Sequence, residues 1–531
     1  MPYKPRHHVV PVQRRRLIIG TSRSTVLRVV QSSVVSLGVS GLIGLIILPR
    51  VLTHLGTERY GVWVTLAVIV AMGQLVATGT TTEVVRRVAS EYGKGDEQAL
   101  TTAVREGTTV LLLIAIVLVG TFVIVARPVV LALFPSTAVR LLPHLPILLV
   151  AIVSLLGIQL VLSGYVSVLN GLQRSDLLNW SGLVAAFCSA AMTISGLSFG
   201  LGIWSLVAAD GSQILVQNGG ALICIRRAMP NLHFGFTRIS VRVFRQFAVA
   251  PVGVAVASAA TLFDSQIDKL ILSASVGPAA AAMFQIGTVL VIGAKAFAVA
   301  PLTVLLAGTA ELFQQRARLD VLESVAVPVA QSIAALTAGV FVLFAPSFIF
   351  LWIGPNYHGA TLSMRVMALA VAINMWSAPW FYYIAGRGRY RYIAIAAAVT
   401  AFLNAASTAF LTTRIGLDGA LIGSVAGSCG GTFTAWLMVR RLEDRHWFRP
   451  VIRAVVPVVA MTAVAVLAFP SRIGHWWVLI AYMAGYGVAG VSLLTITGAL
   501  PLGVVVSSLL GRKSSAARRG GVRSPAGRRG S

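Results

Sequence analysis

Five charged side chains lie inside long apolar runs, and they are the residues of this sequence best placed to do chemistry. Lys295 lies near the middle of its run, and Asp210 lies a third of the way along another. The other three, Asp264, Asp268 and Lys269, fall in the outer half of a third run. Ionisable groups are costly in hydrocarbon, so they normally face a bundle interior or a water-filled cavity and mark a substrate or ion path.

Two interpretations of these charges remain open. A structural ion pair, for instance Lys295 with Asp210 or Asp264, would join helices without moving anything, and Lys269 is close enough to the interface to extend its amine toward water. In the other interpretation the carboxylates take up a proton or Na⁺ and bias the equilibrium between two conformations. Asp210, Asp264 and Asp268 are therefore candidate ion-coupling residues.

Other polar and aromatic residues extend these candidate sites. Asp210 shares its run with Gln213, Gln217 and Asn218, and this composition favours a hydrated groove. Asn404 and Ser407 share one face of a later helix, which close helix packing explains equally well. Trp376 and Trp380, one helical turn apart, are either membrane-interface anchors or platforms for stacking on sugar rings.

No catalytic constellation is recognisable in the chain. Gly93-Lys94-Gly95 lacks the upstream glycine and the following Ser or Thr of a phosphate-binding loop. The eight histidines are scattered, and Cys188, Cys224 and Cys429 form no CxxC motif, so we expect no metal, no disulfide framework and no cofactor. Every expected outside loop is shorter than about 17 residues, too short to hold the groups of a membrane glycosyltransferase. We expect a protein that is not an enzyme.

The elements that position these residues must be transmembrane helices. Of 531 residues, 57% are hydrophobic and only 11% are charged, whereas a soluble domain carries about a quarter charged residues. Crossing the hydrocarbon takes about 20 apolar residues in a helix, while barrel strands are about ten residues of alternating polarity. The sequence predicts an all-α polytopic membrane protein. It would have fourteen helices near residues 29–52, 60–80, 108–126, 143–170, 179–200, 203–225, 247–273, 279–306, 324–352, 361–386, 391–412, 416–438, 452–470 and 475–509.

The distribution of basic residues predicts the orientation. The chain has 43 Lys and Arg against 16 Asp and Glu, a net charge of +27. Of these 43 basic residues, 34 fall in the termini and the even-numbered loops, two lie inside helices, and seven lie on the other side: Arg50, Arg59, Arg127, Arg140, Arg365, Arg414 and Arg472. Because cytoplasmic loops carry the excess of Lys and Arg, both termini should be cytoplasmic. The charge therefore indicates topology and anionic lipid contacts, with no nucleic acid partner.

An internal repeat divides the chain. Gly202 matches Gly416 at an offset of 214, and Gly56 matches Gly277 at an offset of 221. Two parallel six-helix halves explain both offsets if their lengths differ by seven residues, and transporters are often built this way. We expect a basic N-terminal segment (1–28), a first half (29–225), a cytoplasmic linker (226–246), a second half (247–438), two extra helices (452–509) and a disordered basic tail (510–531). The segment 81–106 should form short amphipathic helices on the cytoplasmic face.

Two stretches resemble a known family. The run from Pro49 to Trp63, which contains Gly56, Arg59 and Gly61, resembles the junction of the first two helices in polysaccharide flippases of the Wzx/PST type. These flippases belong to the multidrug/oligosaccharidyl-lipid/polysaccharide exporter superfamily. The run from Asp268 to Ser273, followed by Gly277 and Phe284, resembles the signature that opens the second half.

The resemblance implies a flippase that moves undecaprenyl-pyrophosphate-linked oligosaccharide across the cytoplasmic membrane by alternating access. A pyrophosphate-sugar headgroup cannot cross hydrocarbon unaided, and a cationic cleft open to lipid would lower that barrier. Candidate phosphate partners are Lys295, Lys269, Arg59 and Arg365. Residues 36–44 hold no arginine, unlike the related lipid II flippases, so a capsule, exopolysaccharide or O-antigen unit is favoured. A polysaccharide polymerase and glycosyltransferases would be its functional partners.

Two other functions fit the same sequence. A small-molecule exporter of the superfamily would use the carboxylates for cation coupling and would favour cationic drugs. A scaffold of cell-envelope assembly that transports nothing would tolerate replacement of the buried charges.

Overall fold

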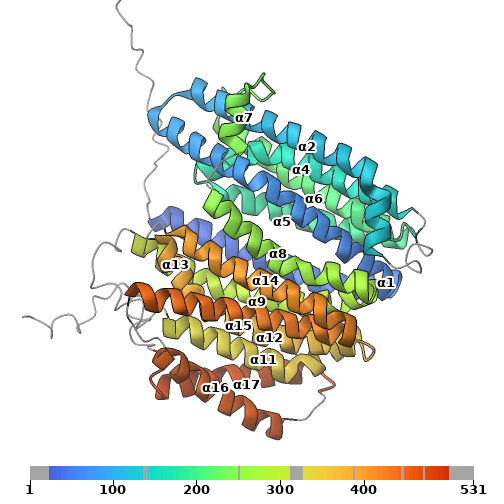
Figure 1. The fold of residues 1–531 in the computed structure, drawn as a ribbon, viewed down its shortest axis with the longest axis vertical. Helices are drawn as coiled ribbons and strands as arrows, with labels where there is room; N and C mark the ends of the chain where they lie inside the picture. Colours follow the sequence, from blue (N-terminus) through green and yellow to red (C-terminus); the bar gives the residue numbers. More distant parts are fainter. Residues whose placement is uncertain are drawn as a thin grey trace, which may run out of the picture.

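The computed structural model describes residues 23–134, 142, 144–248, 252–310, 327–386, 389–443, 448–469 and 473–500. Within these residues every regular element is an α-helix, which confirms the all-α prediction (Figure 1). The expected N-terminal segment falls mostly, and the C-terminal tail entirely, outside the described residues.

Among the described residues, the first half has five long helices. They are α1 (Arg23–Lys94), α2 (Glu97–Leu133), α4 (Leu145–Gly171), α5 (Ser175–Ser198) and α6 (Trp204–Ala228). Helix α1 contains the first two expected spans, which meet at Gly56, where φ is +76° and ψ is 165°. A left-handed backbone of this kind favours glycine, because a β-carbon would be strained there.

The second half follows the short linker helix α7 (Val241–Ala248). Its helices, with the two extra helices α16 and α17 at the end, are α8 (Val252–Ser275), α9 (Pro278–Ala310), α11 (Val327–Ile353), α12 (His358–Met375), α13 (Ala378–Gly386), α14 (Tyr390–Ile415), α15 (Leu417–Glu443), α16 (Phe448–Ala468) and α17 (Trp476–Ile496). Where their residues are described, all fourteen predicted ranges fall on helix. The range 361–386 is shared by α12 and α13. The last helix ends at Ile496, and residues 501–509 of its predicted range lie outside the described residues.

The helices of the two predicted halves pack in the same pattern. In the first half α5 packs on α6 and α1 packs on α4; in the second half α14 packs on α15 and α9 packs on α12. The matched glycines also have matching backbones: Gly202 and Gly416 both have positive φ, 56° and 62°. Gly56 and Gly277 occupy the same junction in each half, with φ of 76° and 127°. Helices α16 and α17 pack on α11.

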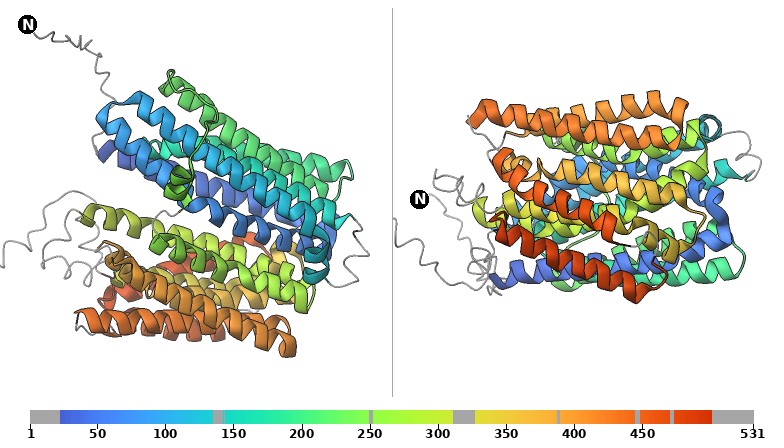
Figure 2. Two further views of the ribbon diagram at one scale, coloured as in Figure 1. Left: turned by 45° about the horizontal axis from the view of Figure 1, so that its top comes forward. Right: turned by 90° about the horizontal axis from the view of Figure 1, so that it is seen from below.

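The two halves meet at one end of the bundle and diverge at the other. In the left view of Figure 2 the blue-to-green first half and the yellow-green-to-red second half come together at the right and separate toward the left. At the joined end Gly61 approaches Pro278 so closely that a β-carbon would lie 1.8 Å from the Pro278 carbonyl oxygen. Leu48 and Leu52 of α1 are buried in one cluster with Ile286 of α9.

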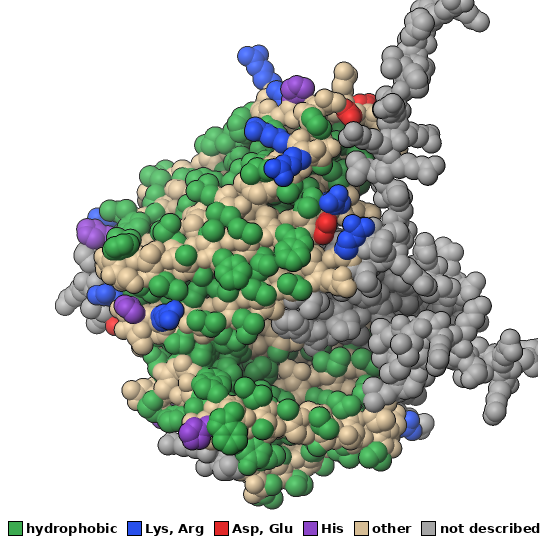
Figure 3. Space-filling view, turned by 180° about the vertical axis from the view of Figure 1, so that it is seen from behind, with side chains coloured by type: hydrophobic (Ala, Val, Ile, Leu, Met, Phe, Trp, Pro, Cys, Tyr) green, Lys and Arg blue, Asp and Glu red, His purple; other side chains and the backbone are tan. Residues whose placement is uncertain are grey.

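The surface fits a lipid environment. Ten of the described helices are long and apolar enough to span a membrane, and the two spans of α1 are counted there as one. Helices α6 and α8 have similar lengths but carry more polar residues. One face of the molecule is covered by hydrophobic side chains, with Lys, Arg and His toward its margins (Figure 3). Ile124 (80% exposed) and Leu467 (89% exposed) show how apolar the exposed surface is.

The segment 81–106 differs from its prediction. The second span of α1 continues as helix to Lys94, and α2 begins at Glu97 as a continuation of the next span, so there are no separate short helices. The only break is at Gly95, with φ of +76°, followed by Asp96, whose carboxylate accepts a hydrogen bond from the Ala99 N–H. A side-chain cap of this kind satisfies one of the free N–H groups of a helix start.

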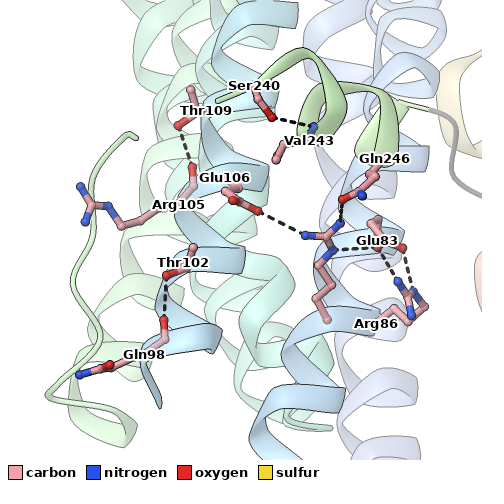
Figure 4. A network of polar contacts seen from close by, with 11 residues as sticks. Glu83, Arg86, Gln98, Thr102, Arg105, Glu106, Thr109, Ser240, Val243 and Gln246 are labelled. Atoms are coloured by element: carbon pink, nitrogen blue, oxygen red, sulfur yellow. Dashed lines mark hydrogen bonds and ion pairs between the residues drawn. The ribbon is translucent and has the colours of Figure 1, made fainter. Parts of the chain in front are cut away.

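A polar network joins these extensions to the linker. The Glu83 carboxylate, only 8% exposed, accepts hydrogen bonds from Arg86 and Arg87. Arg87 also donates to Glu106 on α2 and to Gln246 on α7, and its guanidinium lies 4.3 Å from the ring centre of Phe247. Figure 4 shows Glu83, Glu106 and Gln246 converging from these three helices. The linker helix is thereby fastened to the first half.

Candidate functional site

The two carboxylates of α8 share one face, because they are four residues apart on a helix. The Asn404 amide of α14 donates to Asp264 Oδ1 (3.1 Å) and to Asp268 Oδ2 (3.3 Å). Asp268 is 2% exposed, and it also accepts hydrogen bonds from the hydroxyls of Thr408 and Ser424, each at 2.9 Å. The site is therefore a buried oxygen-rich cluster where α8, α14 and α15 meet.

Glycine in α15 makes this meeting possible. A β-carbon on Gly423 would lie 2.2 Å from Thr408 Oγ1, and one on Gly427 would lie 2.7 Å from the Asn404 β-carbon. Without side chains at these positions α15 approaches α14 closely, as small residues allow in membrane helix packing. The approach brings Ser424 within reach of Asp268.

Two lysines lie near this cluster without forming an ion pair to it among the described residues. Lys295 of α9 donates to Asn374 Oδ1 of α12 at 2.9 Å, and its charge acts on Asp264. Lys269 is 6% exposed and donates to Gln266 Oε1 at 2.6 Å. One turn further along α8, Ser273 Oγ donates to the Leu133 carbonyl of α2, so this face of α8 is turned toward the first half.

The other candidate residues are not part of this cluster. Asp210 is partly buried on α6, in the first half. Arg59 is exposed at the joined end. Arg365 of α12 donates through Nε to the carbonyl of Val342 at 2.9 Å. Because Pro346 has no N–H, that carbonyl lacks its helical partner four residues on, and Arg365 supplies the missing donor.

The two tryptophans occupy packed positions. Trp380 is 4% exposed and therefore lies inside the protein. The Nε1 atom of Trp376 is buried and has no hydrogen-bond partner within the described part of the chain, and the same holds for Oε1 of Gln331 and Oγ of Ser332 on α11. Gln331 donates to the Trp376 carbonyl, so these polar groups lie near one another and near Asn374.

Sequence reasoning identified the charges but missed most of their partners. Asn374, Thr408 and Ser424 are single polar residues in apolar helices, a weak signal because serine and threonine are common there. Asn404 was noticed, but with Ser407 as its companion. The residue that works with Asn404 is Thr408, four positions along the same helix.

Comparison with known families settles which kind of protein carries this site. Residues 26–306, more than half of the chain, match the family described as polysaccharide biosynthesis protein. The chain belongs to this family. The Wzx-like flippases of this family fit the repeat and the buried charges described above. No match was found among curated protein sequences.

Solved structures show the same fold. A structure described as the lipid II flippase MurJ in an inward closed conformation aligns with a TM-score of 0.68 at 11% identity, covering 92% of this flippase-family chain and 100% of its own. An inward-facing multidrug resistance MATE family transporter aligns with a TM-score of 0.56 at 14% identity, and the alignment covers 77% of this chain and 94% of the transporter. A MOP superfamily transporter from Pyrococcus furiosus aligns with a TM-score of 0.54 at 14% identity, and the alignment covers 79% of this chain and 95% of the transporter. These identities are low, so the likeness shows the fold alone.

Proposed function

We propose that this protein moves undecaprenyl-pyrophosphate-linked oligosaccharide units from the cytoplasmic to the outer leaflet of the bacterial inner membrane. The units would serve the synthesis of exopolysaccharide, capsule or O-antigen. The family match carries the proposal, and the two-half fold with cations inside its second half supports it. Glycosyltransferases that build the unit and a polymerase that consumes it are the implied partners.

The orientation follows from the basic residues. Both termini and the end that carries α7 and Lys94 are proposed to be cytoplasmic, because most Lys and Arg lie there. The halves diverge toward that end, so the described conformation would receive substrate from the cytoplasmic side. Alternating access then needs a second state in which the halves separate at the end where Gly61 meets Pro278.

Lys295 and Lys269 are the proposed partners of the pyrophosphate. Both amines are held by amide oxygens and not by carboxylates, so their positive charge is not cancelled by a direct ion pair among the described residues. A cation inside an apolar bundle attracts phosphate oxygens strongly, because little water screens it. Arg59 at the joined end and Arg365 on α12 complete the proposed set, and the lack of arginine in residues 36–44 continues to disfavour lipid II.

Asp264, Asp268 and Asp210 are the proposed ion-coupling residues. Carboxylate, amide and hydroxyl oxygens converge around Asp268, and such oxygens suit a proton or Na⁺. Ion uptake would drive transport only if the two conformations hold the ion differently.

Replacement of Lys295 tests the proposed headgroup contact. Lys295→Ala should abolish transport of a fluorescent undecaprenyl-pyrophosphate oligosaccharide in proteoliposomes, and Lys295→Arg should retain part of it, because arginine keeps the charge but changes donor geometry. Lys94→Ala, which removes an exposed lysine paired with Glu91, is the matched control and should transport normally. Normal transport by Lys295→Ala would remove this residue from the mechanism.

A second candidate function is export of cationic small molecules. The carboxylate pair favours it, since a cluster that holds Na⁺ could also serve a cationic drug. The same proteoliposomes distinguish the two functions. Uptake of ethidium with no movement of the lipid-linked sugar would replace the flippase proposal.

A further inference from the structure

Two prolines inside helices of this bundle leave a backbone carbonyl without its helical partner, and in each case a side chain from another helix donates a hydrogen bond to that carbonyl. A proline inside a helix leaves the carbonyl four residues earlier without its N–H partner. Pro346 frees the Val342 carbonyl, which receives Nε of Arg365 from the neighbouring helix of the same half. Pro49 in α1 frees the Leu45 carbonyl in the same way.

The donor for the Leu45 carbonyl comes from the other half of the molecule. The indole N–H of Trp352, near the end of α11, donates to it at 2.7 Å across 307 residues of chain. The Trp352 ring packs against Phe348, and both belong to the apolar cluster that contains Leu48 and Leu52. The bond therefore lies where the halves meet, beside the close approach of Gly61 to Pro278.

We propose that Trp352 is a gating residue: its indole N–H binds the Leu45 carbonyl that Pro49 leaves free, and this hydrogen bond holds the two halves together at the joined end. The inference deepens the proposed function, because alternating access requires this end to open. In hydrocarbon a free carbonyl is costly, so the bond breaks at low cost only when water reaches Leu45. The two halves can therefore separate at the joined end only together with the entry of water there.

The proline is as necessary to this device as the tryptophan. If residue 49 carried an N–H, the Leu45 carbonyl would be occupied within α1, and Trp352 would gain much less from reaching it. Two variants therefore weaken this one hydrogen bond in different ways. Trp352→Phe keeps an aromatic ring and removes the donor, and Pro49→Ala restores the helical partner and removes the need for the donor.

The test measures distances between the halves in nanodiscs without substrate, so it does not depend on the identity of the lipid. Spin labels on cysteines at His54 and Asn356 report on the joined end, and labels at Gly93 and Arg391 report on the diverging end, in a background lacking the native cysteines. Both Trp352→Phe and Pro49→Ala should raise the ratio of the opened to the joined state about two- to tenfold, the effect of one net hydrogen bond. Trp352→Phe in the Pro49→Ala background should add little.

Two control variants separate this bond from general damage. Tyr486→Phe removes the hydrogen bond between the hydroxyls of Tyr486 on α17 and Thr462 on α16, which lies within one half, and it should leave the distances unchanged. Trp477→Phe alters an exposed tryptophan, 72% exposed, and should also be silent. Additive shifts of Trp352→Phe and Pro49→Ala, or no shift with either, would overturn the gating role. Shifted distances in a protein that moves no lipid-linked sugar would retain the gate and reject the proposed substrate.

Discussion

Asp268 is a buried carboxylate whose hydrogen-bond donors are all neutral. Thr408, Ser424 and Asn404 supply hydroxyl and amide groups, and no lysine or arginine forms an ion pair with it among the described residues. A buried charge without a paired ion costs free energy, and a proton or Na⁺ bound beside it would remove that cost. This arrangement is the reason for proposing Asp268 as an ion-coupling residue.

The coupling prediction follows from this arrangement. Transport in proteoliposomes should respond to a Na⁺ gradient or a pH gradient, and the response should vanish in Asp268→Asn and Asp264→Asn while the proteins remain folded, because the amide carries no charge to neutralise. Asp210→Asn tests the first-half carboxylate in the same way. Asp418→Asn, at an exposed position in the first turn of α15, is the control. Wild-type transport that ignores both gradients would refute coupling.

The sequence could identify these carboxylates but not their environment. A charge in an apolar run is visible by itself, whereas Thr408 and Ser424 stand 140 and 156 residues away from Asp268. Their contact depends on α15 lying close to α14, which depends on Gly423 and Gly427. Glycine is too frequent in membrane helices for that approach to be predicted from one sequence.

At the scale of elements, Arg87 links three helices. It donates hydrogen bonds to Glu83 in α1, Glu106 in α2 and Gln246 in α7, whereas the neighbouring Arg86, whose side chain is 70% exposed, bonds only Glu83 among the residues that the structure describes. Arg86 and Arg87 carry the same charge, but only Arg87 contacts α7. Variants at these two positions therefore separate the effect of losing a charge from the effect of losing the contact with α7. The ends of α1 and α2 were the hardest boundaries to predict. The apolar run marks only the part of a helix that crosses the membrane, whereas a polar sequence that is free of helix breakers can continue as helix beyond it.

Loss of Arg87 should release the linker. Arg87→Gln should increase protease cleavage within residues 229–240 several-fold, because α7 loses the hydrogen bond that its Gln246 accepts from Arg87 and the cation over Phe247. Arg86→Gln should cleave at the wild-type rate. Limited proteolysis of the purified protein followed by mass spectrometry measures both, and equal cleavage of the two variants would contradict the anchoring role.

At the scale of the whole molecule, the positions of the apolar helices among the described residues were predictable and the conformation was not. Matched glycines marked equivalent junctions, since a positive φ at Gly56 and Gly277 constrains the residue type. The proposed alternating-access cycle requires one sequence to serve two states, so nothing in the sequence singles out the state in which Gly61 touches Pro278. That choice rests on small differences between two packings.

Orientation is the property of the whole molecule that labelling can decide. In a background lacking the native cysteines, a cysteine at exposed Gly474 should react with an impermeant thiol reagent in intact cells. One at exposed Ala228, after the sixth span, should stay shielded until the cells are opened. Labelling of Ala228 from outside would reverse the assigned topology.

The fastening of α7 to the first half sets a mechanical limit. Only residues 249–251 separate Ala248 from Val252, the start of α8. Four Cα–Cα steps of about 3.8 Å each give this tether a reach of about 15 Å. While Phe247 stays packed under Arg87, the start of α8 can lie no further than that from Ala248, so chain length sets an upper limit on how far this end of the second half can move from the first. Inserting glycine and serine after Ala248 would raise that limit.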